Sequence, residues 1–147
     1  MPAHYQTLKD QLIVDLRDVF GQDLDVIFGR ARRELNRPAA IIRTTLRREN
    51  YVRRVHEMYS FDIEVRLDVN DIPDSENGCE PYVMQQAEYL VDKLAPHDTT
   101  TTPVPAGLYA GVGNPRYVRD VQYVETEDAQ DWVGFRLEFY TEATVLQ

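Results

Sequence analysis

The chain has 147 residues, enough for one domain and too few for two of ordinary size. With 43% hydrophobic and 28% charged residues, its composition excludes collagen-like, low-complexity and wholly disordered proteins. The net charge is −9, and the single cysteine, Cys79, cannot form an internal disulfide. The sequence shows neither a signal peptide nor a run of about 18 apolar residues. We therefore expect a soluble protein of a reducing compartment with no membrane partner.

Charge is unevenly distributed along the chain. Residues 30–54 hold nine arginines and two acids, a net charge of +7, which leaves −16 on the remainder. Arginine favours bidentate pairing with carboxylates and burial at protein interfaces. We therefore favour self-association, in which the arginine-rich stretch of one subunit faces the acidic surface of the next. Two other interpretations stay open: contact with nucleic acid, which the overall negative charge opposes, and a solvated basic face without a partner.

The first half of the chain predicts one helix and two strands. Apolar residues at steps of three and four over residues 4–20 predict an amphipathic helix, and Gly21 is placed to end it. Residues 24–28 predict a short strand. After an arginine-rich linker, residues 39–46 predict a second strand, and residues 47–50 predict a turn.

The clearest pattern is a long alternation. From Val55 to Val69 the odd positions are apolar except for Glu57, and the even positions are polar except for Met58. Such alternation predicts a strand with one buried and one exposed face. A strand near 15 residues long is well above the usual five or six, so we expect it to project beyond its own sheet.

The second half predicts another helix and two more strands. Residues 68–78 form a polar, acidic loop, residues 83–94 carry a second amphipathic stripe, and residues 98–107 are rich in threonine and proline. Residues 117–124 and 132–140 alternate as strands, joined by an acidic connection. The order α-β-β-β-α-β-β predicts an α+β fold, in which two helices pack on a mixed, largely antiparallel sheet of about five strands.

No pattern of catalytic or ligand-binding residues emerges. His4, His56 and His97 lack partners at metal-ligand spacing, and the acidic loop does not keep the alternate-oxygen spacing of a calcium loop. Ser60 and Ser75 lie in no nucleophile motif. We therefore expect no catalytic residue, no metal and no cofactor, and a protein that is not an enzyme.

Several local patterns point to a known family. They are an N-terminal amphipathic helix, a proline-led strand at 37–42 (RPAAII), the basic and aromatic residues Tyr51, Arg53 and Arg54, a long strand at 59–65 (YSFDIEV), a helix at 83–94, and a closing strand at 133–139 (VGFRLEF). In this order they resemble the phage tail terminator proteins, over most of the chain. The threonine-rich loop at 99–102 and the density of arginine depart from this pattern.

The resemblance implies a single domain over residues 1–147 that acts as a structural, ring-forming subunit. Such proteins form hexameric rings on the head-proximal end of a tail tube, stop its polymerisation and offer a docking surface to the head or neck. The implied partners are further copies of the chain, the tail tube protein, a neck or head-completion protein, and a sheath protein if the tail contracts. DNA would only pass through the lumen. The implied location is the virion tail or neck, after assembly in the host cytoplasm.

A closed ring needs head-to-tail contacts, and an over-long strand pair offers an edge for pairing with a neighbour. The predicted contact residues are Arg30, Arg32, Arg33, Arg37, Arg43, Arg47, Arg48, Arg53, Arg54, Tyr59 and Phe61. Two alternatives stay open. One is another neck, head-completion or sheath-capping subunit, and the other is a nucleic-acid-binding module that uses the arginine cluster.

Overall fold

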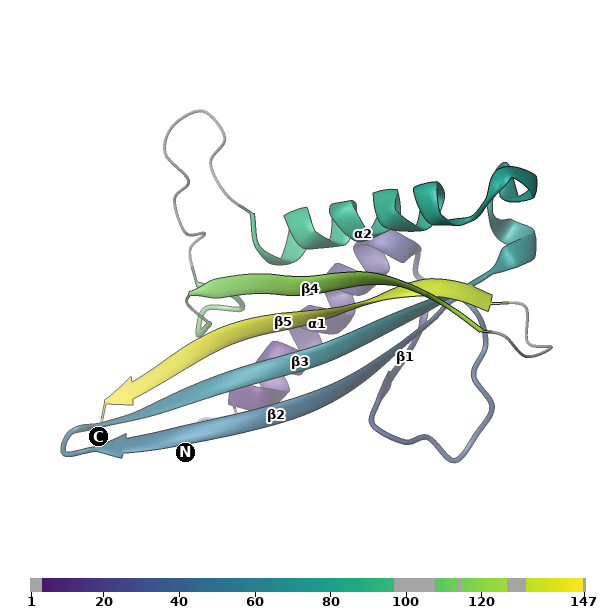
Figure 1. Ribbon diagram of the computed structural model, residues 1–147. Coiled ribbons are helices and arrows are strands. Elements are labelled where there is room, and N and C mark those ends of the chain that lie inside the picture. The colour runs from purple at the N-terminus through teal and green to yellow at the C-terminus, as the bar shows by residue number, and fades with distance from the viewer. Residues whose placement is uncertain (1–3, 97–107, 114, 127–131, 147) are drawn as a thin grey trace, which may run out of the picture.

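A single five-stranded sheet organises the computed structural model, which describes residues 4–96, 108–113, 115–126 and 132–146 (Figure 1). Its elements are α1 (His4–Phe20), β1 (Asp25–Phe28), β2 (Ala39–Tyr51), β3 (Arg54–Asp68), the 3-10 turns η1 (Val69–Asp71) and η2 (Ser75–Asn77), α2 (Glu80–Leu94), β4 (Arg116–Glu125) and β5 (Trp132–Leu146). The strands lie in the order β1-β2-β3-β5-β4. Only β1 and β2 run parallel. The predicted α+β class, with two helices and a five-stranded mixed sheet, is confirmed.

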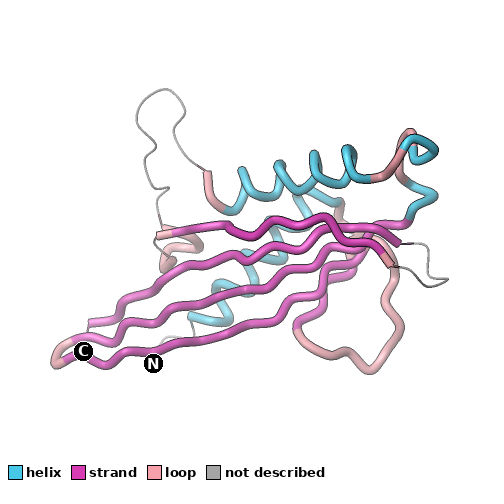
Figure 2. The backbone as a smooth tube through the Cα atoms, in the orientation of Figure 1, coloured by secondary structure: helices cyan, strands magenta, loops and turns pink. Residues whose placement is uncertain are grey.

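Both helices cover the same face of the sheet, and the opposite face carries no helix in the described part of the chain (Figures 1 and 2). The alternation of β3 explains this arrangement, because its odd positions point to the helices and its even positions point away. Phe61, Phe135 and Phe139 are fully buried between sheet and helices. Each such side chain stabilises the fold by about 2–3 kcal/mol through burial. The helices contribute Leu8, Leu12, Leu16, Val83, Ala87, Leu90 and Leu94 to this core.

The three longest strands extend past the ends of both helices (Figure 1). β2 pairs with β3 along its whole length, from the pair Ala39–Arg66 to the pair Tyr51–Arg54. β5 likewise pairs with β3 as far as Leu146, the last residue of β5, which lies opposite Arg54. The prediction that the long strand projects beyond its own sheet is wrong, because β3 pairs with β5 from Arg54 to Asp68 and with β2 from Arg54 to Arg66. The three paired strands extend past the helices together. We call residues 48–57, the part of the β2–β3 hairpin that extends beyond the start of α1, the hairpin arm.

Some predicted boundaries differ from the observed ones. The predicted turn at residues 47–50 is wrong, because these residues continue the ladder opposite β3 and the turn falls at Val52 and Arg53. β5 runs six residues beyond the predicted end at Tyr140, because these residues also pair with β3. α2 begins at Glu80, with Pro81 in its first turn, where proline is favoured. The loop predicted at residues 98–107 and most of the acidic connection lie outside the described residues.

Gly134 fixes the spacing of the two central strands. It lies on β5 opposite Arg66 of β3, and a Cβ atom there would overlap the backbone carbonyl oxygen of Val65. Only glycine allows this close approach. The long β3–β5 ladder therefore depends on a residue without a side chain near the start of β5.

Candidate protein–protein interface

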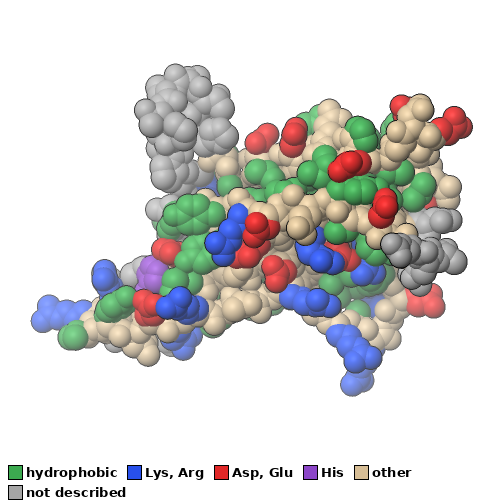
Figure 3. All heavy atoms as spheres, in the orientation of Figure 1, with side chains coloured by type: hydrophobic (Ala, Val, Ile, Leu, Met, Phe, Trp, Pro, Cys, Tyr) green, Lys and Arg blue, Asp and Glu red, His purple; other side chains and the backbone are tan. Residues whose placement is uncertain are grey.

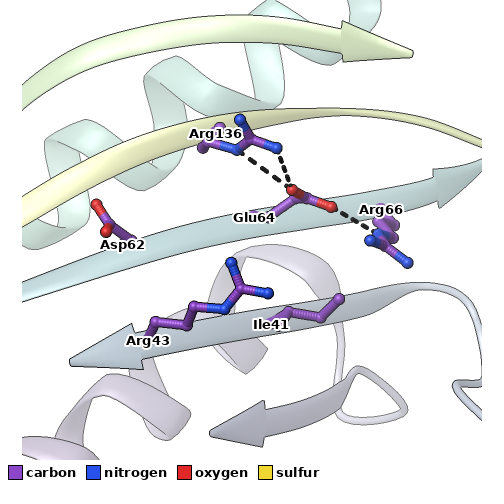
Figure 4. A pocket seen from close by; sticks show the side chains of 6 residues that line it. All are labelled: Ile41, Arg43, Asp62, Glu64, Arg66 and Arg136. Carbon is purple, nitrogen blue, oxygen red and sulfur yellow. Dashed lines mark hydrogen bonds and ion pairs between the residues drawn. The ribbon is translucent and has the colours of Figure 1, made fainter. Parts of the chain in front are cut away.

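The open face of the sheet carries a ladder of paired charges at its centre. Arg136 donates to Glu64 with an Nη2–Oε2 distance of 2.7 Å, and Arg66 donates to the other oxygen with an Nε–Oε1 distance of 2.7 Å (Figure 4). Burial alone would raise the pKa of Glu64, but the hydrogen bonds from the two arginines outweigh it and hold that pKa below its ordinary value. Two arginines share one carboxylate, so this trio has a net positive charge.

Three shallow hollows adjoin on and beside this face. The first, of about 290 Å³, lies over β2, β3 and β5 (Figure 4). The second, of about 500 Å³, shares Arg66 with the first, and the third, of about 350 Å³, shares Arg43 with the first. We call the three together the basic groove. Its charged residues are Arg30, Arg33, Glu34, Arg37, Arg43, Asp62, Glu64, Arg66 and Arg136.

The segment between β1 and β2 is anchored by one carboxylate. Arg33 makes a bidentate pair with Asp25, with an Nη1–Oδ2 distance of 2.7 Å, and the backbone N–H of Asn36 donates to the same oxygen at 3.1 Å. The hydrogen bonds from Arg33 lower the pKa of Asp25 to about 2. The charge of Arg33 is therefore neutralised within the subunit. The charge of Arg37 is neutralised in part, because its Nη2 lies 3.7 Å from Oδ2 of Asp68.

Other arginines of the cluster are left without a carboxylate. Among the described residues Arg30, Arg32, Arg43 and Arg53 form no ion pair, and all four are exposed. Arg30 and Arg43 line the basic groove, so the groove offers two guanidinium groups that form no ion pair with any acid the structure describes. Unpaired arginines of this kind suit carboxylate or phosphate partners.

Arg48 has a different role, at the base of the hairpin arm. Its Nη2 lies 3.1 Å from Oε1 of Glu57, a carboxylate that is only 4% exposed. Tyr59 donates its hydroxyl to the other oxygen of Glu57, and Nδ1 of His4 lies 3.8 Å from that oxygen. This cluster explains why an acid interrupts the apolar row of β3. Arg48 thus stabilises its own subunit.

The tip of the hairpin arm exposes apolar and basic groups together. Val52 in the turn is 95% exposed, and Tyr51 beside it is 46% exposed. Leu46, further back along β2, is also 46% exposed. The guanidinium of Arg54 lies 4.7 Å from the centre of the Tyr51 ring. Aromatic and arginine side chains are enriched where proteins meet.

The outer edge of β2 is open beyond the end of β1. The N–H of Gly29 donates to the carbonyl of Ile42, so the even residues of β2 direct their backbone groups away from β3. β1 ends at Phe28, opposite Ile42, and no described strand borders β2 beyond that point. From Thr44 to Asn50 this edge can therefore accept a further strand.

The predicted contact residues divide into three groups. Most arginines lie at the surface of the basic groove or the hairpin arm, and Arg47 lies on the open face near the tip. Arg48 is engaged with Glu57. Tyr59 and Phe61 are 2% and 0% exposed, so they pack in the core of this subunit and not at its surface.

Sequence reasoning missed two arginines and the tryptophan of the groove. Arg66 and Arg136 come from the polar faces of β3 and β5, and Arg66 lies 4.5 Å from the centre of the Trp132 ring. The alternation of apolar and polar residues places Arg66 and Arg136 on the exposed face, and this pattern could have identified them as surface residues. Their meeting depends on the β3–β5 register, which no local pattern reveals.

No protein-family model and no curated protein matches the sequence. The structure is similar to a chain in the solved virion of a native gene transfer agent (GTA) particle, with a TM-score of 0.52 and 14% sequence identity, over 95% of this chain and 92% of that chain. At this identity the likeness establishes a shared fold over nearly the full length of both chains.

No helix among the described residues is long and apolar enough to cross a membrane. No group of three or more His, Cys, Asp or Glu side chains in the described ranges is arranged to hold a metal ion.

Proposed function

We propose that the protein is a structural subunit of a phage-like virion that acts as a tail terminator. In this role six copies form a ring on the head-proximal end of the tail tube, stop its polymerisation and provide the docking surface for the head or neck. The observation that carries the proposal is the fold shared, end to end, with a chain of a gene transfer agent virion. The role needs no catalytic residue, metal or cofactor.

The two sides of the subunit support ring formation. A ring closes through heterologous contacts, in which one surface of each copy meets a different surface of the next. The basic groove, the hairpin arm and the open edge of β2 lie together along one side of the sheet, whereas the acidic helix α2 lies on the other face. Such a subunit joins head to tail more readily than face to face.

The proposed partners are further copies of the chain, the tail tube protein, a neck or head-completion protein, and a sheath protein if the tail contracts. DNA is proposed to pass through the ring without lasting contact, because a protein with a net charge of −9 repels it at long range. The proposed location is the tail or neck of the virion.

A neighbouring role in the same assembly is the second candidate. The fold likeness is to a chain of a whole virion and therefore also suits a neck, head-completion or sheath-capping subunit. The two roles differ in what fails when the protein is missing. A terminator limits tube length, whereas a head-completion or neck subunit acts on the head side of the joint.

The test is an early stop codon in the gene of the producing strain, followed by electron microscopy of the particles. Loss of a terminator is expected to give tubes of uncontrolled length without heads, and a plasmid copy of the gene restores normal length. Tubes of normal length that fail to join heads would favour the second candidate. Complete particles without the protein would contradict both.

A further inference from the structure

We propose that the basic groove binds the acidic surface of α2 and its preceding turns in a second copy of this chain. The inference rests on the proposed ring and names the two surfaces that meet in it. The groove supplies Arg30 and Arg43, which have no ion pair in the described part of the chain. Its lining also includes the apolar side chains of Ile41 and Trp132.

The complementary surface is unusually acidic. Between Arg66 and Arg116 the only lysine or arginine is Lys93, and its Nζ is paired with Asp18 at 3.2 Å. Six acids of the turns and of α2 are exposed and form no ion pair with a described residue. We call them the acidic flank: Asp71, Asp74, Glu76, Glu80, Glu88 and Asp92. Figure 3 shows acidic side chains gathered over α2 and the adjoining turns, and basic ones over the hairpin arm and the loop before β2.

The acidic flank carries repulsion that its own subunit does not relieve. Glu88 and Asp92 lie one helical turn apart, and like charges at this spacing destabilise a helix by about 0.2–0.5 kcal/mol. Tyr89, beside them, is 51% exposed and offers an aromatic side chain to a partner. A basic surface placed against this side of α2 would remove the repulsion.

The two surfaces cannot meet within one molecule. The residues of the first hollow project from the open face of the sheet, and α2 packs on the other face against β4 and β5 (Figures 1 and 4). Groove against groove and flank against flank would each bring like charges together. The favourable contact therefore joins the groove of one copy to the flank of another. That contact is heterologous, so it can repeat from copy to copy, and it forms a ring where the rotation closes.

The test uses two charge-reversed forms of the full chain. The groove variant carries Arg30→Glu and Arg43→Glu, and the flank variant carries Glu88→Arg and Asp92→Arg. In each variant alone the two surfaces repel, and we expect self-association to weaken by more than about 100-fold. Mixed in equal amounts, they are expected to restore rings of alternating subunits, because each reversed surface then meets its opposite. Native mass spectrometry with one variant tagged reads out this pairing.

Two controls keep the result interpretable. Asp10→Arg with Asp23→Arg changes the charge equally at exposed acids outside the flank, and it should assemble like the wild type. Circular dichroism checks that every variant folds. The neutral pairs Arg30→Gln with Arg43→Gln, and Glu88→Gln with Asp92→Asn, should weaken assembly less than the reversals do.

Each possible result either supports or contradicts the proposed contact between groove and flank. Restoration only in the mixture supports the inference. If the wild type forms rings and either variant alone forms them equally well, the contact between groove and flank is overturned, but the proposed ring is not. A wild type that forms no ring, even with tail tubes present, would contradict both. If the wild-type ring instead binds double-stranded DNA, and the groove variant still forms the ring but no longer binds DNA, that result would assign the groove to nucleic acid binding.

Discussion

Arg48 of β2 lies directly opposite Glu57 of β3, and its guanidinium meets a carboxylate buried on the helix side of the sheet. The Nη2–Oε1 distance is 3.1 Å, and Tyr59 donates to the remaining oxygen. The pair joins the two strands of the hairpin arm at the point where it leaves the body of the subunit. Arg48 therefore stabilises the fold, whereas other arginines of the cluster remain available to bind a partner.

Arg48→Glu is therefore expected to destabilise the isolated subunit. It leaves Glu57 buried without its cation and adds a second negative charge beside it. Breaking a fully buried pair costs about 3–5 kcal/mol, and because Arg48 is itself half exposed we expect about 2–3 kcal/mol here. Arg47→Glu, at a neighbouring exposed position, should change stability by less than about 1 kcal/mol. Urea denaturation of both variants measures the difference, and equal stability of the two would contradict the assigned role of Arg48.

Gly134→Ala is expected to cost about 3 kcal/mol or more. The added methyl group would overlap the carbonyl oxygen of Val65, so one of the two central strands must shift. Gly21→Ala is the matched control. Its φ of 102° disfavours alanine, but open space surrounds it, so a cost of about 1 kcal/mol is expected. Thermal unfolding compares the two, and a larger loss at Gly21 would show that the β3–β5 contact is not as close as described.

The Asp25–Arg33 pair predicts a dependence of stability on pH. The carboxyl has a pKa of about 2 in the folded chain and an ordinary value of 3.8. Its contribution is therefore complete above about pH 4 and is lost as the pH falls towards 2. Because Arg33 is exposed and solvent screens the pair, we expect this contribution to be small.

Arg33→Ala isolates this contribution from that of the other carboxylates. The pKa of Asp25 should rise towards 3.8, and the difference in unfolding free energy between wild type and variant should shrink between pH 4 and pH 2. Carboxyl titration by NMR reads out the pKa directly. An Asp25 that titrates alike in both proteins would show that Arg33 does not hold it.

The open edge of β2 predicts opposite effects of proline at adjacent positions. The N–H of Leu46 points away from β3, so Leu46→Pro should keep the fold while blocking the edge and lowering ring yield. The N–H of Thr45 faces β3, so Thr45→Pro removes a ladder hydrogen bond and should cost about 3 kcal/mol. Circular dichroism and native mass spectrometry separate the two effects. Normal rings from Leu46→Pro would exclude the edge from the subunit contact.

Much of the fold follows from local patterns. The stripe of α1 and the alternation of β3 depend on burial of one face, which the residue spacing records directly. The end of β2 does not follow, because the polar run Arg47–Asn50 has the composition of a turn and becomes a strand only by pairing with β3.

The candidate site was only partly predictable. The arginine cluster is visible in the sequence, but its division between internal pairs and free charges is not. Arg48 is engaged because the register places Glu57 opposite it, and Arg43 is free because its cross-strand neighbour Asp62 makes no ion pair with it. Arg136 enters the groove from a strand far along the chain. Register and tertiary packing decide all three.

The central claim is that copies of this chain form a ring that caps a tail tube. Its most direct test is negative-stain microscopy combined with native mass measurement of the purified protein, with and without its tail tubes. We predict a six-fold ring, either free in solution or seated on one end of the tube. A protein that stays monomeric and leaves both tube ends bare would contradict the account.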